Sequence, residues 1–264
     1  MKSYKYINYK TIKHIAILTL NRPEVMNALN REITLEIHEI LEQLPSFFPE
    51  IRVLIITGSG KGFCSGADLS RMATIGSENR KSNQASNIKR IQELAPAIRN
   101  IPQPVISAVN GPAVGAGLSI ALASDIRIAS DKASFSAIFV KRGLVPDTAA
   151  SATLNSIAGH SVAAEMALTG NSYDAIWALS KGLISDIVPA KNLIDETVNM
   201  AQNIAGNPPL AVRQTKKLLR YSMPDWADII AEEDDSGDML YDTKDKKESV
   251  QAFLEKRTPN YTGK

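Results

Sequence analysis

The sequence of 264 residues contains one cysteine, Cys64, and three histidines. A single cysteine excludes a disulfide within the chain and argues against a metal site built from cysteine ligands. We interpret Cys64 as a small buried residue rather than a reactive thiol. We expect His14 in a strand, His38 on an amphipathic helix and His160 in a turn, each of them structural or exposed rather than catalytic.

Long apolar runs and an excess of one charge are also missing. No segment approaches the roughly 20 consecutive apolar residues that a membrane-spanning helix needs, and the first ten residues, MKSYKYINYK, lack the apolar core of a signal peptide. Because 30 basic residues face 28 acidic ones, the net charge is only +2, which gives no general attraction to nucleic acid or to an anionic membrane. The sequence predicts a soluble cytoplasmic protein that binds anions only locally.

Apolar residues make up 44% of the chain, enough to bury a large core. Apolar runs predict strands at Ile15–Leu20, 51–57 and 104–109, and residues 32–44 have the pattern of an amphipathic helix. From residue 149 onward the chain looks mainly helical, and prolines at 208–209 and 224 are suited to open helices. Alternating strands and helices without a clear linker indicate an α/β fold, and such folds often form one domain at this length.

Residues 103–130, QPVISAVNGPAVGAGLSIALASDIRIAS, run from an apolar strand through a turn of small residues into a helix. Because Gly115, Ala116 and Gly117 have almost no side-chain bulk, a ligand can approach the backbone where the helix begins. The first amides of a helix lack internal partners and favour negative charge. Such an amide stabilises an oxyanion by roughly 3 kcal/mol. Alternatively, these glycines only allow the helix to pack closely on a strand.

A second junction of the same kind follows the strand at 51–57, where the sequence is GSGKGFCSGADLSRM. We expect a helix after Asp68, with the Asp68 carboxylate as its N-cap. Two such junctions could offer two amides to one carbonyl oxygen. Their separation in sequence does not say whether they meet in space.

Four segments together resemble the enoyl-CoA hydratase/isomerase family, the crotonases: NRPEVMNALN, GKGFCSGADL, NGPAVGAGLSIALASDIRIAS and QAFLEKRTPNYTG. The resemblance covers essentially the whole chain. It implies a ββα spiral core, assigned to residues 1–200, and a helical C-terminal region, residues 201–264, that forms trimers, commonly paired as hexamers. The two parts would form one continuous functional unit.

The resemblance also implies an acyl-CoA thioester substrate, with coenzyme A as part of the substrate and no other cofactor or metal. The thioester carbonyl would be held by two backbone amides, which by position are those of Ala67 and Ala116. Hydratases of the family use two glutamates to position and deprotonate water, and these positions are Ser119 and Phe139 here. Serine is a poor base without an activating neighbour, and phenylalanine has no proton to exchange. These residues argue against two-glutamate hydration.

Asp147, in GLVPDTAAS, is the remaining carboxylate of this region. An apolar pocket would raise its pKa toward neutrality, as a proton-shuttling base requires. The alternative is that Asp147 is only the N-cap of a helix at 148–158. The sequence resembles crotonases that shift double bonds, including ring-modified phenylacetyl-CoA isomerases, in which this aspartate removes a proton and returns it elsewhere. The predicted function is therefore enoyl-CoA isomerisation with Asp147 as the acid and base.

Two other functions stay open beside hydration. PDTAAS also resembles 4-chlorobenzoyl-CoA dehalogenases, in which the aspartate is a nucleophile, but those enzymes use a histidine that is missing between Lys81 and Gln103. The chain could also be a non-catalytic protein that binds acyl-CoA or an acyl-carrier-protein thioester.

The resemblance implies further binding residues. Ala67, Asp68, Leu69 and Ser70 would contact the adenine and pantetheine, Arg22 would lie near the phosphates, and Ser119 and Phe139 would line the substrate site. Lys256 or Arg257 could reach a phosphate, including one on a neighbouring subunit. The polar segment after Leu69 predicts a mobile stretch before a helix at 88–99, and the resemblance implies that this stretch borders the acyl pocket. We interpret EEDDSGDMLYDTKDKKES as a solvated helix face and turn.

Overall fold

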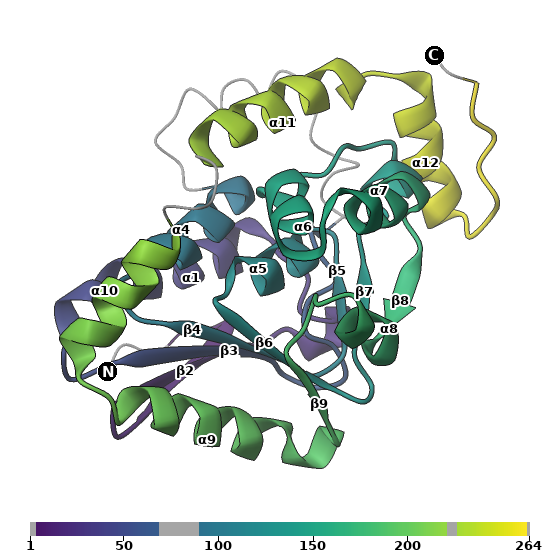
Figure 1. Ribbon diagram of the computed structural model, residues 1–264. Helices are drawn as coiled ribbons and strands as arrows, with labels where there is room; N and C mark the ends of the chain where they lie inside the picture. Colours follow the sequence, from purple (N-terminus) through teal and green to yellow (C-terminus); the bar gives the residue numbers. More distant parts are fainter. Residues whose placement is uncertain (1–3, 69–89, 221–225, 263–264) are drawn as a thin grey trace.

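The computed structural model describes residues 4–68, 90–220 and 226–262, and its strands and helices alternate in an α/β fold (Figure 1). A six-stranded sheet has the order β1-β2-β3-β4-β6-β9, and a three-stranded sheet has the order β5-β7-β8. The large sheet consists of Ile7–Ile12 (β1), Ile15–Leu20 (β2), Val53–Gly58 (β3), Val105–Val109 (β4), Ile126–Ser130 (β6) and Asp186–Val188 (β9), and the small sheet of Pro112–Val114 (β5), Ser134–Ser136 (β7) and Ser172–Asp174 (β8).

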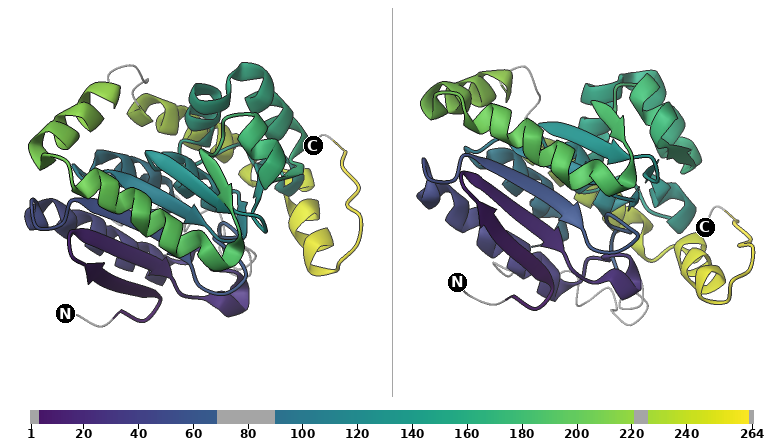
Figure 2. Two further views of the ribbon diagram at one scale, coloured as in Figure 1. Left: turned by 60° about the horizontal axis from the view of Figure 1, so that its bottom comes forward. Right: turned by 90° about the horizontal axis from the view of Figure 1, so that it is seen from below.

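The central strands of the large sheet, β2, β3 and β4, are buried on both faces. Strands β2, β3, β4, β6 and β9 are parallel neighbours, and parallel sheets need cover on both sides. Ile15 and Ile17 pack on one face with residues of α9 (Leu193–Ala205), while Ala16 and Leu18 join the larger core on the other. Figure 2 shows α9 lying across its face of the sheet. The opposite face carries α1 (Arg31–Gln43), α4 (Leu94–Asn100) and α5 (Ala116–Ala123).

A strand-strand-helix unit occurs twice in succession. Strand β4 of the large sheet leads to β5 of the small sheet and then to α5, and β6 leads in the same way to β7 and then to α6 (Ala150–Ala158). The second strands of the two units, β5 and β7, are parallel neighbours. This repeat is the ββα arrangement that the sequence analysis expected.

The C-terminal part is helical, as predicted. Residue 200 lies inside α9, so the predicted division of the chain cuts a helix that covers the sheet; the division itself stays a prediction. The remaining helices are His160–Thr169 (α7), Ala175–Ser180 (α8), Pro209–Arg220 (α10), Trp226–Tyr241 (α11) and Lys244–Leu254 (α12), with short 3₁₀ helices at Pro23–Val25 (η1), Leu44–Phe47 (η2), Ile91–Glu93 (η3), Ile138–Arg142 (η4) and Ala190–Asn192 (η5).

Several local predictions need correction. His14 lies in the turn between β1 and β2 instead of in a strand, and the strand predicted at 51–57 begins at Val53. The helix predicted at 88–99 is η3 followed by α4, which ends at Asn100. The charged segment predicted to be solvated contains Glu233 and Lys246, which are both buried. Leu69, Ser70, the expected mobile segment and Pro224 lie outside the described residues.

Within the described parts of the chain, no helix combines the length and apolar character needed to span a bilayer. The same residues contain no group of three or more histidine, cysteine or acidic side chains arranged to hold a metal ion. Cys64 is fully buried, as expected, and burial raises the pKa of its thiol to about 12.

Candidate active site

The two glycine-rich junctions of the sequence lie against each other. The amide of Cys64 donates to the Pro112 carbonyl at 3.0 Å, and the amide of Val114 donates to the Cys64 carbonyl at 2.9 Å. A Cβ at Gly117 would lie only 2.2 Å from the Cys64 oxygen, so this approach requires glycine. The close-packing interpretation therefore holds for Gly117, and that packing brings the two junctions together.

The N–H group of Ala67 points away from the neighbouring segment that contains Leu29. Leu29 donates to the Gly66 carbonyl at 2.7 Å and accepts from the Asp68 amide at 2.9 Å. Because successive residues of an extended chain face opposite sides, the N–H between these two partners faces away from Leu29. Ala116, the first residue of α5, is close by: a Cβ at Gly66 would lie 3.5 Å from the Ala116 nitrogen.

The amides of Ala67 and Ala116 have spare donor capacity. The first bond of the α5 turn runs from the Ser119 amide to the Gly115 carbonyl at 3.1 Å, so the Ala116 amide precedes the helical ladder. Across residues 4–68, 90–220 and 226–262, neither amide donates a hydrogen bond. Since the start of a helix also carries the positive end of its dipole, the arrangement suits a negatively charged oxygen.

Phe139 contributes an apolar wall at the start of α5. It lies on η4 and is buried, and its Cε1 atom is 3.9 Å from the position that a Cβ at Gly115 would occupy. Gly115 itself is the N-cap residue and has a φ of +55°, which glycine adopts without penalty. A phenyl ring accepts no proton, so position 139 contributes shape and low polarity next to the Ala116 amide.

Ser119 joins the start of α5 to the segment that carries Asp147. Its side chain is fully buried, and its hydroxyl lies 3.3 Å from the Gly115 carbonyl and 3.1 Å from the Asp147 carbonyl, with both oxygens as acceptors. Both hydrogen bonds of this hydroxyl are to backbone carbonyls, and the role of Ser119 in lining the substrate site stays a prediction. Asp147 is therefore held beside the first turn of α5 although 28 residues separate it from Ser119.

Asp147 leads into a turn with unusual backbone conformation. Thr148 and Ala149 both lie in the left-handed region, with φ of +57° and +59°. Helix α6 begins at Ala150, and its N-cap residue is Ala149, which makes no side-chain cap. The alternative prediction, that Asp147 is the N-cap of this helix, is wrong. Instead, the Asp147 Oδ1 atom accepts from the Thr148 hydroxyl at 3.0 Å.

Glu233 of α11 contacts the turn after Asp147, which the sequence did not predict. Its carboxylate accepts from the Ala149 amide at 2.9 Å and from the Ser151 amide at 3.0 Å, and it also accepts from the Ser151 hydroxyl. Burial raises the pKa of Glu233, and these hydrogen bonds oppose the rise. A signal existed: Glu233 falls at helical spacing with the buried Trp226, Ile230 and Gly237, so it belongs to the buried stripe of α11.

Arg22 and Asp68, both expected at the coenzyme, form an ion pair. The Arg22 Nη2 atom lies 3.0 Å from the Asp68 Oδ2 atom, and Nη1 donates to the Ala28 carbonyl at 2.6 Å. This pair fixes the backbone next to Ala67, because Asp68 is the adjacent residue. The helix that Asp68 was predicted to cap lies outside the described residues.

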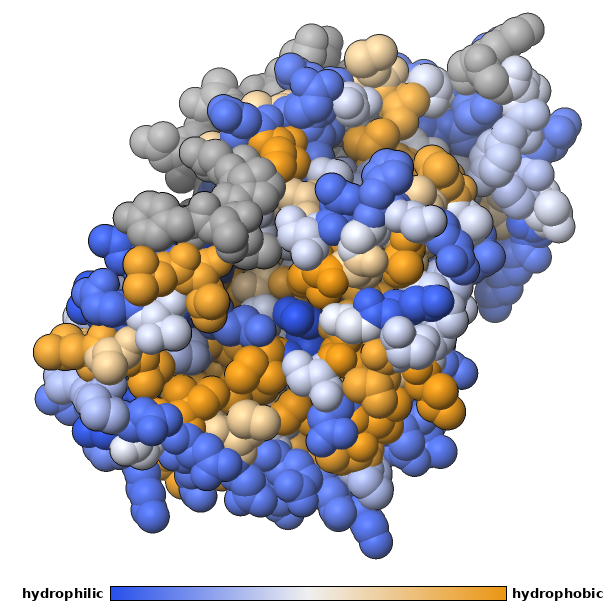
Figure 3. Space-filling view, viewed as in Figure 1, coloured by the Kyte–Doolittle hydropathy of each residue, from blue (hydrophilic) through white to orange (hydrophobic). Residues whose placement is uncertain are grey.

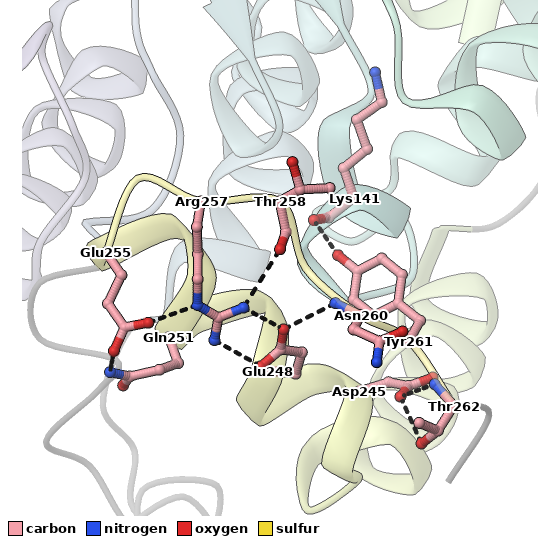
Figure 4. Close-up of polar contacts among 10 residues, drawn as sticks. All are labelled: Lys141, Asp245, Glu248, Gln251, Glu255, Arg257, Thr258, Asn260, Tyr261 and Thr262. Atoms are coloured by element: carbon pink, nitrogen blue, oxygen red, sulfur yellow. Dashed lines mark hydrogen bonds and ion pairs between the residues drawn. The ribbon is translucent and has the colours of Figure 1, made fainter.

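The C-terminal tail folds back on α12 and η4 (Figure 4). The Arg257 guanidinium bonds both oxygens of Glu248 at 2.6 and 2.9 Å, and it also pairs with Glu255 at 2.6 Å. This pairing lowers the pKa of the partly exposed Glu248 carboxyl to about 2. Tyr261 donates to the Lys141 carbonyl of η4 at 3.2 Å. Arg257 therefore holds the tail, and Tyr261 joins the tail to η4, the element that carries Phe139. A phosphate contact of Lys256 or Arg257 stays a prediction.

Comparison with known proteins gives a consistent result. The family model for enoyl-CoA hydratase/isomerase matches residues 10–264. A probable enoyl-CoA hydratase of Rhodobacter capsulatus is 38% identical over 99% of this chain and 100% of its own, and the 1,2-epoxyphenylacetyl-CoA isomerase of Escherichia coli is 35% identical over 96% of both. A crystal structure of methylmalonyl-CoA decarboxylase complexed with 2S-carboxypropyl CoA, 29% identical, superposes with a TM-score of 0.86 and covers all of both chains. The chain therefore belongs to the enoyl-CoA hydratase/isomerase family.

Proposed function

We propose that this protein shifts the double bond of an enoyl-CoA thioester, with Asp147 as the group that removes and returns the proton. The observation that carries the proposal is the contact between Ser119 and the Asp147 carbonyl. It holds the only acidic residue of this segment beside the helix start where the Ala67 and Ala116 amides lie close together. The two positions at which family hydratases have glutamates are Ser119 and Phe139, which are not bases.

The proposed reaction has two proton transfers. The thioester oxygen accepts from the Ala67 and Ala116 amides, each of which contributes roughly 3 kcal/mol to the charged transition state. The Asp147 carboxylate removes a proton from the acyl chain, and the electron pair of the broken C–H bond spreads into a dienolate. The carboxylic acid then returns the proton to a different carbon and the thioester re-forms. The product is an isomer, so the reaction needs no metal, redox cofactor or net water.

The relatives support an acyl-CoA substrate, and exposed apolar side chains on α10 support self-association. The Escherichia coli relative named above is an isomerase of a CoA thioester, and the decarboxylase structure has a CoA thioester analogue bound, which favours an acyl-CoA substrate here. Helix α10 exposes Leu210, Leu218 and Leu219, each by more than 60%, and Figure 3 shows apolar side chains over this helix. Such a row favours self-association, and we propose a homotrimer or a dimer of trimers.

The Asp147→Asn variant tests the base. Asparagine keeps the size of the side chain and removes its basicity, so turnover of a panel of 2- and 3-enoyl-CoAs should fall by about 10²- to 10⁴-fold. Asp174→Asn is the matched control, because Asp174 caps α8 and asparagine caps equally well. Near wild-type isomerase activity in a folded Asp147→Asn variant would show that Asp147 is not the base.

Products and isotope exchange separate the other functions. In deuterated water the isomerase exchanges acyl-chain protons and releases an isomer of the same mass apart from deuterium. A hydroxyacyl-CoA product would instead establish hydration, and halide release from a halobenzoyl-CoA would establish dehalogenation. Binding of acyl-CoA or of an acyl-carrier thioester without exchange or turnover would identify a binding protein.

A further inference from the structure

We propose that Glu233 is a positioning residue for Asp147: from α11 it holds the left-handed turn that presents the Asp147 carboxylate to the substrate. This inference rests on the proposed role of Asp147 as the base. Glu233 lies 84 residues from Ala149 in sequence. In this proposal it acts through the turn and does not contact the substrate.

The turn after Asp147 needs an external constraint. Thr148 and Ala149 are consecutive residues with positive φ, a conformation in which a Cβ crowds the backbone, and the branched side chain of threonine makes it worse. Neither residue is a glycine, and strained residues of this kind persist only where their surroundings fix them. Both side chains are fully buried, so packing supplies part of the constraint and hydrogen bonds must supply the rest.

Glu233 supplies those bonds from outside the segment. Helix α6 has no side-chain cap of its own, and the Glu233 carboxylate takes that place through the Ala149 and Ser151 amides. A carboxylate also complements the positive end of the α6 dipole. Glu233 is 7% exposed, so little water is at hand to replace these bonds. Without Glu233, the buried Ala149 amide and the part-buried Ser151 amide at the start of α6 would lose their acceptor.

Asp147 is thus held from two sides. On one side, the Ser119 hydroxyl of α5 bonds the Asp147 carbonyl. On the other, Glu233 fixes Ala149, only two residues further along. Between them, Thr148 donates its hydroxyl to the Asp147 carboxylate, so the conformation of Thr148 contributes to the direction of that carboxylate.

The neighbouring acid of α11 offers a matched control. Asp234 pairs with Arg90 at 2.7 Å and helps to dock α11, and among the residues that the structure describes it makes no hydrogen bond to the Asp147 turn. If Glu233 only docked the helix, replacing either acid would affect the protein in the same way. If Glu233 positions the base, the two substitutions differ in kcat at equal folded fraction.

The test compares kcat and KM for Glu233→Gln, Asp234→Asn and Asp147→Asn on the enoyl-CoA that the wild-type enzyme isomerises. Glutamine has an NH₂ group in place of one carboxylate oxygen, and this group cannot accept a hydrogen bond. One of the two backbone amides, that of Ala149 or that of Ser151, therefore loses its acceptor. We expect Glu233→Gln to lower kcat by roughly 10- to 100-fold, the effect of misplacing a reacting group by about 1 Å, with KM within threefold of wild type. Asp234→Asn should keep kcat within threefold.

A second substitution tests the mechanism by rescue. Glycine adopts positive φ without strain, so Ala149→Gly in the Glu233→Gln background should let the turn form without its tether and recover at least threefold in kcat. If Glu233→Gln does not fold, Glu233→Asp takes its place, because it keeps the charge and shortens the reach by one methylene. The expected result is then the same loss of kcat and the same rescue.

Three outcomes would overturn the inference: wild-type kcat in folded Glu233→Gln, equal losses in Glu233→Gln and Asp234→Asn, or no recovery on adding Ala149→Gly. The role of Asp147 is judged separately from Asp147→Asn. If that variant is active, the proposed function fails; if it is inactive while Glu233→Gln is fully active, only the positioning inference fails.

Discussion

Replacing Gly117 with alanine should separate the two backbone segments that carry Ala67 and Ala116. The new Cβ would lie 2.2 Å from the Cys64 oxygen and 2.8 Å from the Cys64 carbon. Contacts below 3.0 Å are essentially never seen, so the two segments have to move apart by about 0.8 Å. The obstacle is backbone, which cannot swing away as a long side chain can.

The Gly117→Ala substitution should affect both the stability of the protein and its kcat. Alanine gains up to about 1 kcal/mol over glycine inside a helix, but overpacking costs about 1–3 kcal/mol, so we expect a net loss of about 1 kcal/mol. At this chain length the loss lowers Tm by about 2–4 °C. If the shift takes one amide out of reach of the thioester oxygen, kcat falls by roughly 10²- to 10³-fold.

The assay measures Tm and kcat together, with Gly182→Ala as the control. Gly182 has a φ of +73° and open space where a Cβ would sit, so alanine there costs about 1–2 kcal/mol of strain without moving the junctions. That variant should lose stability and keep its kcat. A Gly117→Ala protein with wild-type Tm and kcat would refute the close approach of the two junctions as described.

The buried ionisable groups of Lys216 and Cys64 give two further predictions. Burial lowers the pKa of Lys216 to about 8, despite its 2.7 Å ion pair with Asp125. Lys216 therefore loses its proton near pH 8 in the folded protein and near pH 10.5 in the unfolded chain. Because the unfolded chain binds more protons between these two pH values, the free energy of unfolding rises with pH over that window. The free energy of unfolding of wild type relative to Lys216→Met, measured with urea, should rise by about 3 kcal/mol between pH 8 and 10.5, and a constant difference would contradict the burial of Lys216. Cys64 is fully buried and its thiol has a pKa of about 12. It should react with iodoacetamide at pH 8 about a thousandfold more slowly than a free thiol, which mass spectrometry can follow. Rapid labelling of the folded protein would refute the burial of Cys64.

The family and the α/β class followed from the sequence because their signals are local. Apolar runs mark buried strands, and small residues after a strand mark a tight entry into a helix. Those signals placed β2 at its observed bounds and predicted a helix after the strand at 104–109, where α5 lies. They also singled out Asp147, since its segment has a recognisable resemblance.

The detailed arrangement of the candidate site did not follow from those signals. Asp147 matched the pattern of an N-cap, yet the cap position is Ala149 and the acceptor is Glu233 from another helix. The Ser119 hydroxyl bonds the nearby Gly115 carbonyl and also the distant Asp147 carbonyl. The contacts of Glu233 with Ala149 and of Ser119 with Asp147 join distant parts of the chain, which spacing along the chain cannot show.

The sequence by itself therefore determined which elements form, which segments carry small residues, and which family the chain resembles, because propensity and periodicity act over a few neighbouring residues. Only the tertiary structure decided that Gly117 packs on Cys64, that the Ala67 and Ala116 amides lie near each other, and that Glu233 holds the turn after Asp147. Those contacts join residues tens of positions apart. Their free energy depends on burial and exact direction, which exist only once the chain has folded.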